Sequence, residues 1–145
     1  MSDQARSVTP VVVPQWPRPR GYANGVLGTG ATLHVAGQIG WLPDGTFPSD
    51  DLLAQFALAL DNVLAVVRAA GGAPEHIASM TVFVTEIETY RARTGELGPI
   101  WRARLGRHFP AMALVGVTAL VEPQAKVEIL AVAHLPAAPG SSSGP

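Results

Sequence analysis

The chain has 145 residues, 48% of them hydrophobic and 14% charged, which suits one domain with a sizeable core. Ten basic and 11 acidic residues give a net charge of −1, without the dense basic cluster that a nucleic-acid partner requires. The absence of cysteine excludes disulfides, thiol nucleophiles and cysteine-ligated metals. Because no apolar run reaches about 20 residues and no signal-peptide pattern follows Met1, we expect a cytoplasmic protein without a membrane partner.

The two ends of the sequence differ in composition from its middle. Residues 1–20 are expected to form an N-terminal tail and extended arm, because the prolines at 14, 17 and 19 do not suit a central strand. Within them, residues 1–10 are expected to fray, and Trp16 to pack against the body. Residues 21–135 form the expected domain, and residues 136–145, rich in Pro, Gly and Ser, a disordered tail.

Two short strands are predicted around a hairpin turn at Gly28-Thr29-Gly30, the second running from Thr32 to Gly37. A long helix is expected further on, with Ser49 as its N-cap and Gly71-Gly72 as its stop. Apolar residues recur in it every three or four positions and form one stripe, made of Leu53, Phe56, Leu60, Val63, Leu64 and Val67.

The second half of the chain contains three more strand signals and one more helix. Residues 78–85 alternate and are β-branched, which predicts a strand. Thr85 and Glu88 form a capping box that opens a second helix, weakened in its middle by two glycines and a proline. Residues 112–120 and 125–135 are predicted to be two final strands joined by a turn.

This order of elements predicts an α+β fold in which two helices cover one face of a single sheet. So few helices leave the other face of the sheet bare. A low charge content with many Ala, Val and Leu is also typical of surface that is buried between subunits. We therefore expect the bare face to pack against another copy, in a dimer or a ring.

Six stretches in order, "GYANGV", "LHVAGQIG", "VVRAAGG", "TVFVT", "HFPAM" and "KVEILAVA", resemble the RidA/YjgF family of reactive-intermediate deaminases. The resemblance implies a chorismate-mutase-like α+β fold and a homotrimer with three clefts between subunits. It also implies hydrolysis of 2-imino or enamine acids to 2-oxo acids and ammonia, without a metal or a cofactor.

The same resemblance assigns roles to residues of this chain. Glu128 matches the glutamate that positions or activates the attacking water. Tyr22 matches a cleft tyrosine, Gly37 supplies a backbone amide, and Leu114 is placed among the substrate-binding residues. Other interpretations remain open: Glu128 can face solvent or form an inter-subunit ion pair, Tyr22 can be a packed aromatic, and Gly37 can be a backbone requirement.

Two positions depart from the family pattern. Thr94 stands where the family has an asparagine, and Met112 where an arginine grips the substrate carboxylate. Methionine has no charge and no donor, and a loss of about 3 kcal/mol corresponds to about 100-fold or more in binding or rate. Arg18 or Arg20 could reach the cleft instead, whereas the arginines of residues 102–107 are expected to face solvent.

The four histidines show no metal-ligand spacing. His34 is expected to be a packed structural residue, and His108 to contact carbonyls at a helix end, while His76 and His134 are isolated.

Two hypotheses follow. The first is a RidA-like hydrolase acting on C–N bonds of a less acidic or more apolar imine or enamine, with standard 2-imino acid deamination weak or absent. The alternative is a non-catalytic trimer that binds or sequesters a small-molecule ligand. Fully standard deamination ranks lowest, and a ribonuclease activity has no support in the residues.

Overall fold

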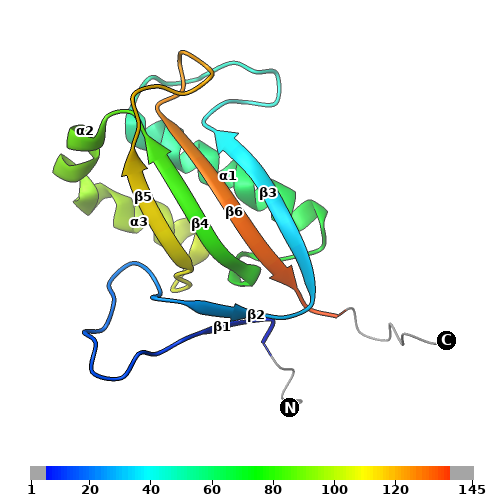
Figure 1. The fold of residues 1–145 in the computed structure, drawn as a ribbon. Helices are drawn as coiled ribbons and strands as arrows, with labels where there is room; N and C mark the ends of the chain where they lie inside the picture. The colour runs from blue at the N-terminus through cyan, green and yellow to red at the C-terminus, as the bar shows by residue number, and fades with distance from the viewer. Residues whose placement is uncertain (1–5, 138–145) are drawn as a thin grey trace.

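A computed structural model describes residues 6–137 and is built around a four-stranded sheet in the order β3-β6-β4-β5 (Figure 1). The strands are β3 (Ala31–Ile39), β6 (Val127–Leu135), β4 (Ile77–Val84) and β5 (Ala111–Gly116). β6 is antiparallel to both of its neighbours, while β4 and β5 are parallel. The two final strands were predicted to adjoin across a turn, but β4 lies between them.

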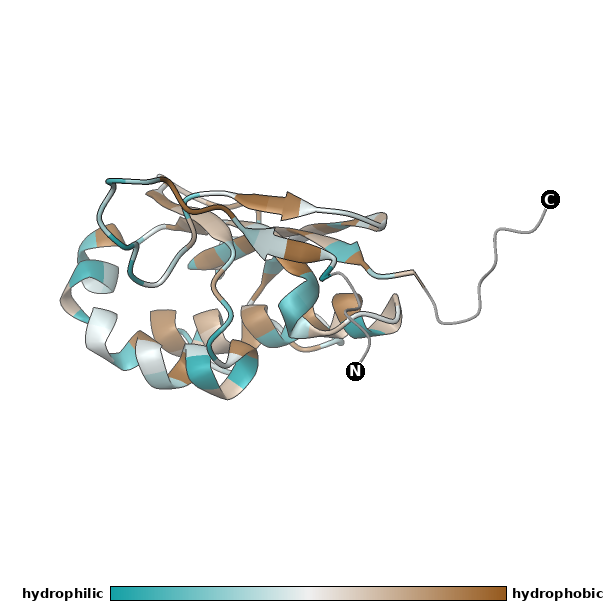
Figure 2. Ribbon diagram, turned by 90° about the horizontal axis from the view of Figure 1, so that it is seen from below, coloured by the Kyte–Doolittle hydropathy of each residue, from teal (hydrophilic) through white to brown (hydrophobic). Residues whose placement is uncertain are grey.

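Three α-helices lie on one face of this sheet, α1 (Leu52–Ala69), α2 (Ile87–Ala92) and α3 (Thr94–Leu105) (Figure 2). A short 3-10 helix, η1 (Pro74–His76), leads into β4. The predicted α+β fold with helices on one face is confirmed. The second expected helix is divided in two at Arg93 rather than bent near its glycines.

The first two strands, β1 (Val8–Pro10) and β2 (Val26–Gly28), pair with each other and stand apart from the main sheet. The predicted hairpin between the strands around Gly28-Thr29-Gly30 is therefore wrong, although both strands exist. The prediction that residues 1–10 fray is wrong for Val8, which is buried and lies in β1, paired with β2. Trp16 is 63% exposed and does not pack against the body. Of the tails expected at residues 1–10 and 136–145, residues 1–5 and 138–145 lie outside the described residues.

Helix α1 forms the centre of the core, as its apolar stripe predicts. Asp51, not Ser49, is the N-cap, and its side chain accepts from the Ala54 amide at 3.0 Å. Ser49 instead accepts from the amide of Asp51. The helix is long and apolar enough to cross a membrane by composition, but half of it is buried inside this fold. Six stripe residues are buried against the sheet, Leu53, Phe56, Leu60, Val63, Leu64 and Val67.

The start of α2 also differs from the prediction. Its N-cap is Glu86, which makes no side-chain cap hydrogen bond, so the capping box of Thr85 and Glu88 does not form. Glu88 pairs instead with Arg91 on the helix surface. Thr85 remains tied to the end of β4, where its amide donates to the Lys126 carbonyl at 3.0 Å.

The sheet has one covered and one open face. Along β6, Ile129 points toward the helices and is fully buried, while Leu130 points away and is 43% exposed. Val115 of β5 is 42% exposed on the same open side. Side chains on a strand alternate between the two faces of a sheet. These strands carry apolar residues at both alternating sets of positions, so the open face is apolar as well as the covered one. The expected bare face is present in this chain.

Candidate functional site

A cavity of about 440 Å³ lies beside β5, between α2 and α3 and the end of the N-terminal arm. We call it the β5 pocket. It brings together four residues to which the sequence assigned a substrate-binding role: Tyr22, Thr94, Met112 and Leu114. The other lining residues are Arg20, Gly21, Phe56, Tyr90, Leu97, Gly98, Trp101 and Phe109.

The register of β5 explains why Met112 enters this pocket. Met112 pairs with Met80 and Leu114 pairs with Val82, in parallel strands. Met80 and Val82 are buried beneath the helices, so their partners point to the helix side as well. Because β5 is the edge strand, the helices cover it incompletely and leave the pocket.

The segment that leads into β5 is fixed by contacts to α3 and to β4. Trp101 of α3 donates from Nε1 to the His108 carbonyl at 3.0 Å, and its ring stacks on Phe109 with centroids 5.9 Å apart. His108 Nε2 lies 2.7 Å from the Ile77 carbonyl oxygen at the start of β4. His108 therefore contacts a backbone carbonyl as expected, but one of the sheet rather than of the helix end.

The N-terminal arm is attached to the same place. The Ala23 amide donates to the Pro110 carbonyl at 3.0 Å, and Ala23 forms an isolated parallel bridge with Ala111. Tyr22, the preceding residue, is thereby held at the pocket with its side chain 43% exposed.

Three hydroxyl groups supply most of the pocket's polarity. Tyr22 and Thr94 lie at the exposed side, and Tyr90 is half-buried among the apolar residues. Burial raises the pKa of the Tyr90 phenol, so this group stays neutral and can donate a hydrogen bond at physiological pH. No acidic residue lines the pocket, and its single ionic side chain is that of Arg20.

Sequence reasoning missed the aromatic lining of this pocket. Trp101 belongs to the hydrophobic core and Tyr90 packs against it, and as a second role both line the pocket. Their second role depends on the break at Arg93 and on the edge position of β5, neither of which has a local sequence signal.

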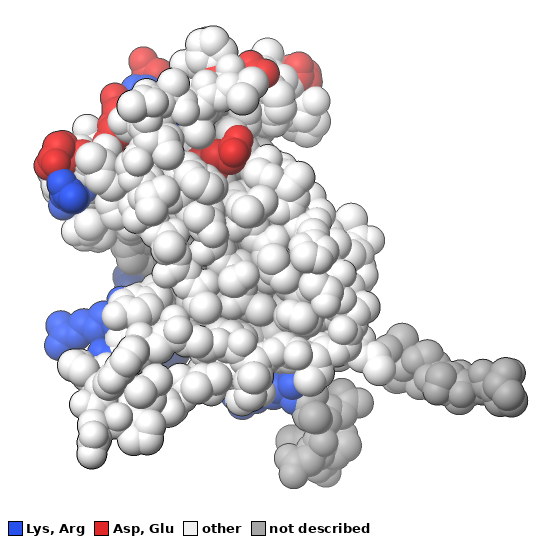
Figure 3. All heavy atoms as spheres, in the orientation of Figure 1, with Lys and Arg blue, Asp and Glu red and all other residues white. Residues whose placement is uncertain are grey.

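Glu128 lies elsewhere, on the open face of the sheet. It pairs with Phe83 across β4 and β6, next to the buried pair Val82 and Ile129, so its side chain points to the opposite face. Glu128 is the only Asp, Glu, Lys or Arg within the four strands of the main sheet. Figure 3 shows that much of this side of the molecule is free of charged atoms.

Gly37 lies directly against Glu128. A Cβ atom at Gly37 would lie 2.8 Å from the carboxyl carbon of Glu128, closer than real Cβ contacts allow. The strand also bulges between Val35 and Gln38, so neither Ala36 nor Gly37 has a pairing partner on β6. A side chain at this position would displace the Glu128 carboxylate, and the Gly37 backbone is taken out of the ladder beside it.

The candidate residues consequently fall into two half-sites on opposite faces of one sheet. Tyr22, Thr94, Met112 and Leu114 gather on the helix side at the β5 edge, and Gly37 and Glu128 gather on the open face. A single chain does not bring Glu128 to Met112.

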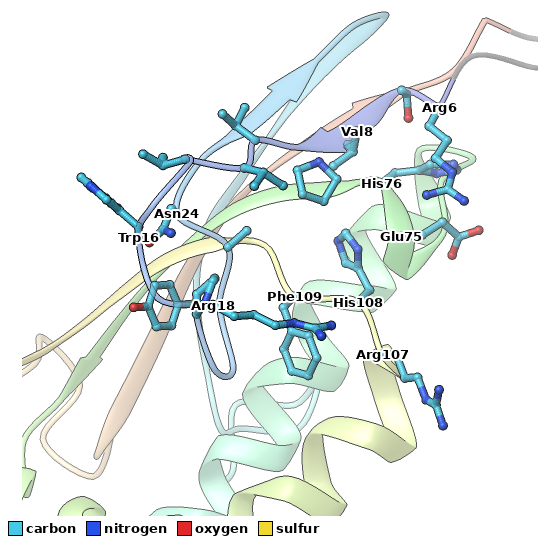
Figure 4. A pocket seen from close by; sticks show the side chains of 18 of the residues that line it. Arg6, Val8, Trp16, Arg18, Asn24, Glu75, His76, Arg107, His108 and Phe109 are labelled. Atoms are coloured by element: carbon cyan, nitrogen blue, oxygen red, sulfur yellow. The ribbon is translucent and has the colours of Figure 1, made fainter.

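A second cavity, of about 1000 Å³, lies under the N-terminal arm (Figure 4). We call it the arm cavity. Figure 4 shows Arg6, Glu75 and His76 at one end of it and Trp16 at the other, with the Arg18 side chain extending toward Phe109 between them. Arg18 thus lines this cavity, whereas Arg20 lines the β5 pocket.

The other arginines near α3 do not all face solvent as expected. Arg104 is three-quarters buried and pairs with Asp61 of α1, with its Nε 2.8 Å from the carboxylate. Arg102 and Arg107 are exposed as expected.

The expectation for His34 is wrong in the isolated chain. It is exposed on the open face instead of being packed. His76 Nδ1 accepts from the Ala73 amide at 2.9 Å within η1. Nδ1 of His134 is buried and has no hydrogen-bond partner among the described residues. In residues 6–137, no three His, Asp or Glu side chains gather in a way that could hold a metal ion.

Comparison with known proteins agrees with this geometry. A family model described as Endoribonuclease L-PSP matches residues 16–135. A Rid-family protein of unknown function from Yersinia pestis, YyfB, is 28% identical with a TM-score of 0.76, over 89% of this chain and 99% of that one. The YjgF gene product of E. coli is 30% identical with a TM-score of 0.63, over 86% and 91%. No curated protein matches the sequence. The chain belongs to the Endoribonuclease L-PSP family, which is the RidA/YjgF family.

Proposed function

We propose that the protein is a Rid-like enzyme that hydrolyses a reactive imine or enamine in clefts between subunits. The observation that carries this proposal is the position of Glu128. It is the only ionic side chain in the four strands, it lies on an apolar face, and Gly37 leaves the space for its carboxylate. A carboxylate on a face that another subunit covers is costly unless it has a partner or a role.

The assembly in this proposal is a homotrimer. Leu130 and Val115 are exposed on the open face, and a neighbouring copy would remove them from water. Each cleft then combines the open-face half-site of one copy with the β5 pocket of the next. In this arrangement Glu128 of one copy lies close to Met112 of the next, although the two residues are on opposite faces within one chain.

The chemistry needs one water and one general base. The Glu128 carboxylate accepts a proton from a water, and the water oxygen attacks the imine carbon. Glu128 returns this proton to the imine nitrogen, which gives a carbinolamine. The hydroxyl proton of the carbinolamine then passes through Glu128 to the nitrogen, which leaves as ammonia while the carbon becomes a carbonyl. The Gly37 amide stabilises negative charge on oxygen, and Tyr22 orients the substrate.

Met112 limits which substrates this cleft accepts. An arginine at this position would form two charge-assisted hydrogen bonds to a carboxylate, and a thioether forms none. A small imino acid such as 2-iminobutyrate has little apolar surface to compensate. We therefore expect its deamination to be weak or absent.

A non-catalytic binding protein is the second candidate. The apolar lining of the β5 pocket favours it, because a pocket of this kind retains a ligand without any chemical step. The ribonuclease in the family's description is not favoured, because none of the four strands carries a Lys or Arg that would contact phosphates.

The test is ammonia release from imines that an amino-acid oxidase generates in situ. Wild type should accelerate release from an apolar imine, and Glu128→Gln should abolish that acceleration. Met112→Arg should gain activity on 2-iminobutyrate. Strong turnover of 2-iminobutyrate by wild type would contradict the substrate argument. Full activity of Glu128→Gln would contradict the assignment of the base.

A further inference from the structure

We propose that the substrate carries an aromatic or branched apolar group and one carboxylate, and that Arg20 binds this carboxylate at the mouth of the β5 pocket. The proposal rests on the assignment of the β5 pocket as the substrate site. It makes Arg20, on the N-terminal arm, a specificity-determining residue that supplies the charge absent from Met112.

The interior of the pocket fits a flat apolar group. Phe56 and Trp101 form its buried side, with 2% and 8% of their surfaces exposed. The Trp101 Nε1 group is already used, because it donates to the His108 carbonyl. What these residues offer a ligand is therefore apolar and aromatic surface, which favours a ring or a branched alkyl group.

Arg20 is the only group at the pocket that can neutralise an anion. None of the ion pairs formed within residues 6–137 involves Arg20. Arg93, close to the pocket at the start of α3, is held by both Asp51 and Glu96. These two carboxylates neutralise its charge and use its Nε, Nη1 and Nη2 groups, so Arg93 is less suited than Arg20 to bind an anion.

The backbone of the arm explains how Arg20 comes to this place. Gly21 has a φ of 78°, a conformation that residues with a side chain rarely adopt. This turn lets Arg20 and Tyr22, on either side of Gly21, line the same pocket. The Ala23 hydrogen bond to Pro110 then fixes the turn against β5.

Binding of stable 2-oxo acids, the product class of the proposed reaction, tests this without requiring turnover. Phenylpyruvate carries both the ring and the carboxylate, 2-oxobutyrate lacks the ring, and phenylacetone lacks the carboxylate. Calorimetry should show phenylpyruvate binding about tenfold or more tightly than either of the others, since each feature contributes at least one factor of ten.

Two arm variants provide the matched comparison. Arg20→Gln should weaken phenylpyruvate binding about tenfold and leave phenylacetone binding unchanged. Arg18→Gln, two residues away in the arm cavity, should leave both ligands unchanged. Equal loss in both variants would mean that only long-range charge matters, and it would overturn the proposal.

The outcomes also separate this inference from the proposed function. Phenylpyruvate binding that depends on Arg20, without ammonia release from any imine, supports the inference and contradicts the proposed enzyme activity. Ammonia release that depends on Glu128 but not on Arg20, with no preference for aromatic imines, supports the enzyme and overturns the inference.

Discussion

The two faces of the main sheet are built by the same strands and differ in what covers them. On the helix face, Ile129 is completely buried and belongs to the core. One residue further along, Leu130 is apolar yet 43% exposed. The first face accounts for the stability of the chain. The second has exposed apolar surface and one carboxylate, and in the function proposed above this face serves assembly and chemistry.

The sharpest contrast between the faces comes from truncating neighbouring residues of β6. Ile129→Ala should lower the free energy of unfolding by about 3 kcal/mol, because it leaves a cavity in a closed core. Leu130→Ala should cost under about 1 kcal/mol within the chain and instead weaken association between copies. Urea unfolding measures the first effect, and light scattering at several concentrations measures the second. Similar losses of chain stability would refute the distinction.

A second prediction concerns the loops that fasten α1 to the sheet. Gln55 is buried, donates to the Ser49 and Gln124 carbonyls at 3.0 Å, and accepts from the Lys126 amide at 2.8 Å. Gln55→Leu keeps the size but leaves these backbone groups unpaired, at a cost of about 2–3 kcal/mol. The exposed Asn24→Leu is the control, and its free energy of unfolding in urea should change by under about 0.5 kcal/mol.

On the open face, Gly37→Ala should force the Glu128 carboxylate to move and cost about 1–2 kcal/mol. The double variant Gly37→Ala with Glu128→Ala should recover most of that stability, because the carboxylate is gone. A thermodynamic cycle on the four proteins measures the coupling. Additive effects of the two substitutions would show that the two side chains do not compete for space.

The smallest expected effect is at the N-terminus of α1. The hydrogen bond from Arg93 lowers the pKa of Asp51 below its usual 3.8. The carboxylate therefore stabilises the folded chain above that pH, and this contribution is lost as the pH falls through the folded pKa. Asp51→Asn keeps a cap and removes the charge, so its deficit should be at most about 1 kcal/mol at pH 7.

The measurement for Asp51→Asn is urea unfolding at pH 7 and at pH 3. The difference from wild type should shrink at the lower pH, because below 3.8 the unfolded chain binds a proton at this carboxyl while the lowered folded pKa delays binding in the folded chain. A difference that stays constant or grows toward low pH would show that Arg93 does not act through the charge of Asp51.

Local patterns predicted most of the fold. The apolar stripe from Leu53 to Val67 identified α1, and the alternation in residues 78–85 identified β4. The pairing of strands was harder to predict. β1 with β2, and β4 between β5 and β6, are long-range choices that depend on the whole sheet and carry no local signal.

The candidate site was predicted as a set of residues but not as a geometry. Tyr22, Thr94, Met112 and Leu114 do share one pocket, and Gly37 does adjoin Glu128. Their separation onto two faces follows from the register of β5 and β6, which a sequence pattern does not specify. Arg20 could be named but not placed, because its position depends on the turn at Gly21.

The most direct test of the central claim joins the two half-sites chemically. The natural chain has no cysteine, so Glu128→Cys and Met112→Cys can be combined in one chain and treated with a short bis-maleimide. If the half-sites meet between copies, covalent species of two and three chains of 15.1 kDa appear, while each single-cysteine variant stays monomeric on a denaturing gel. If the double variant also remains at 15.1 kDa, the clefts do not form between Glu128 of one copy and Met112 of the next.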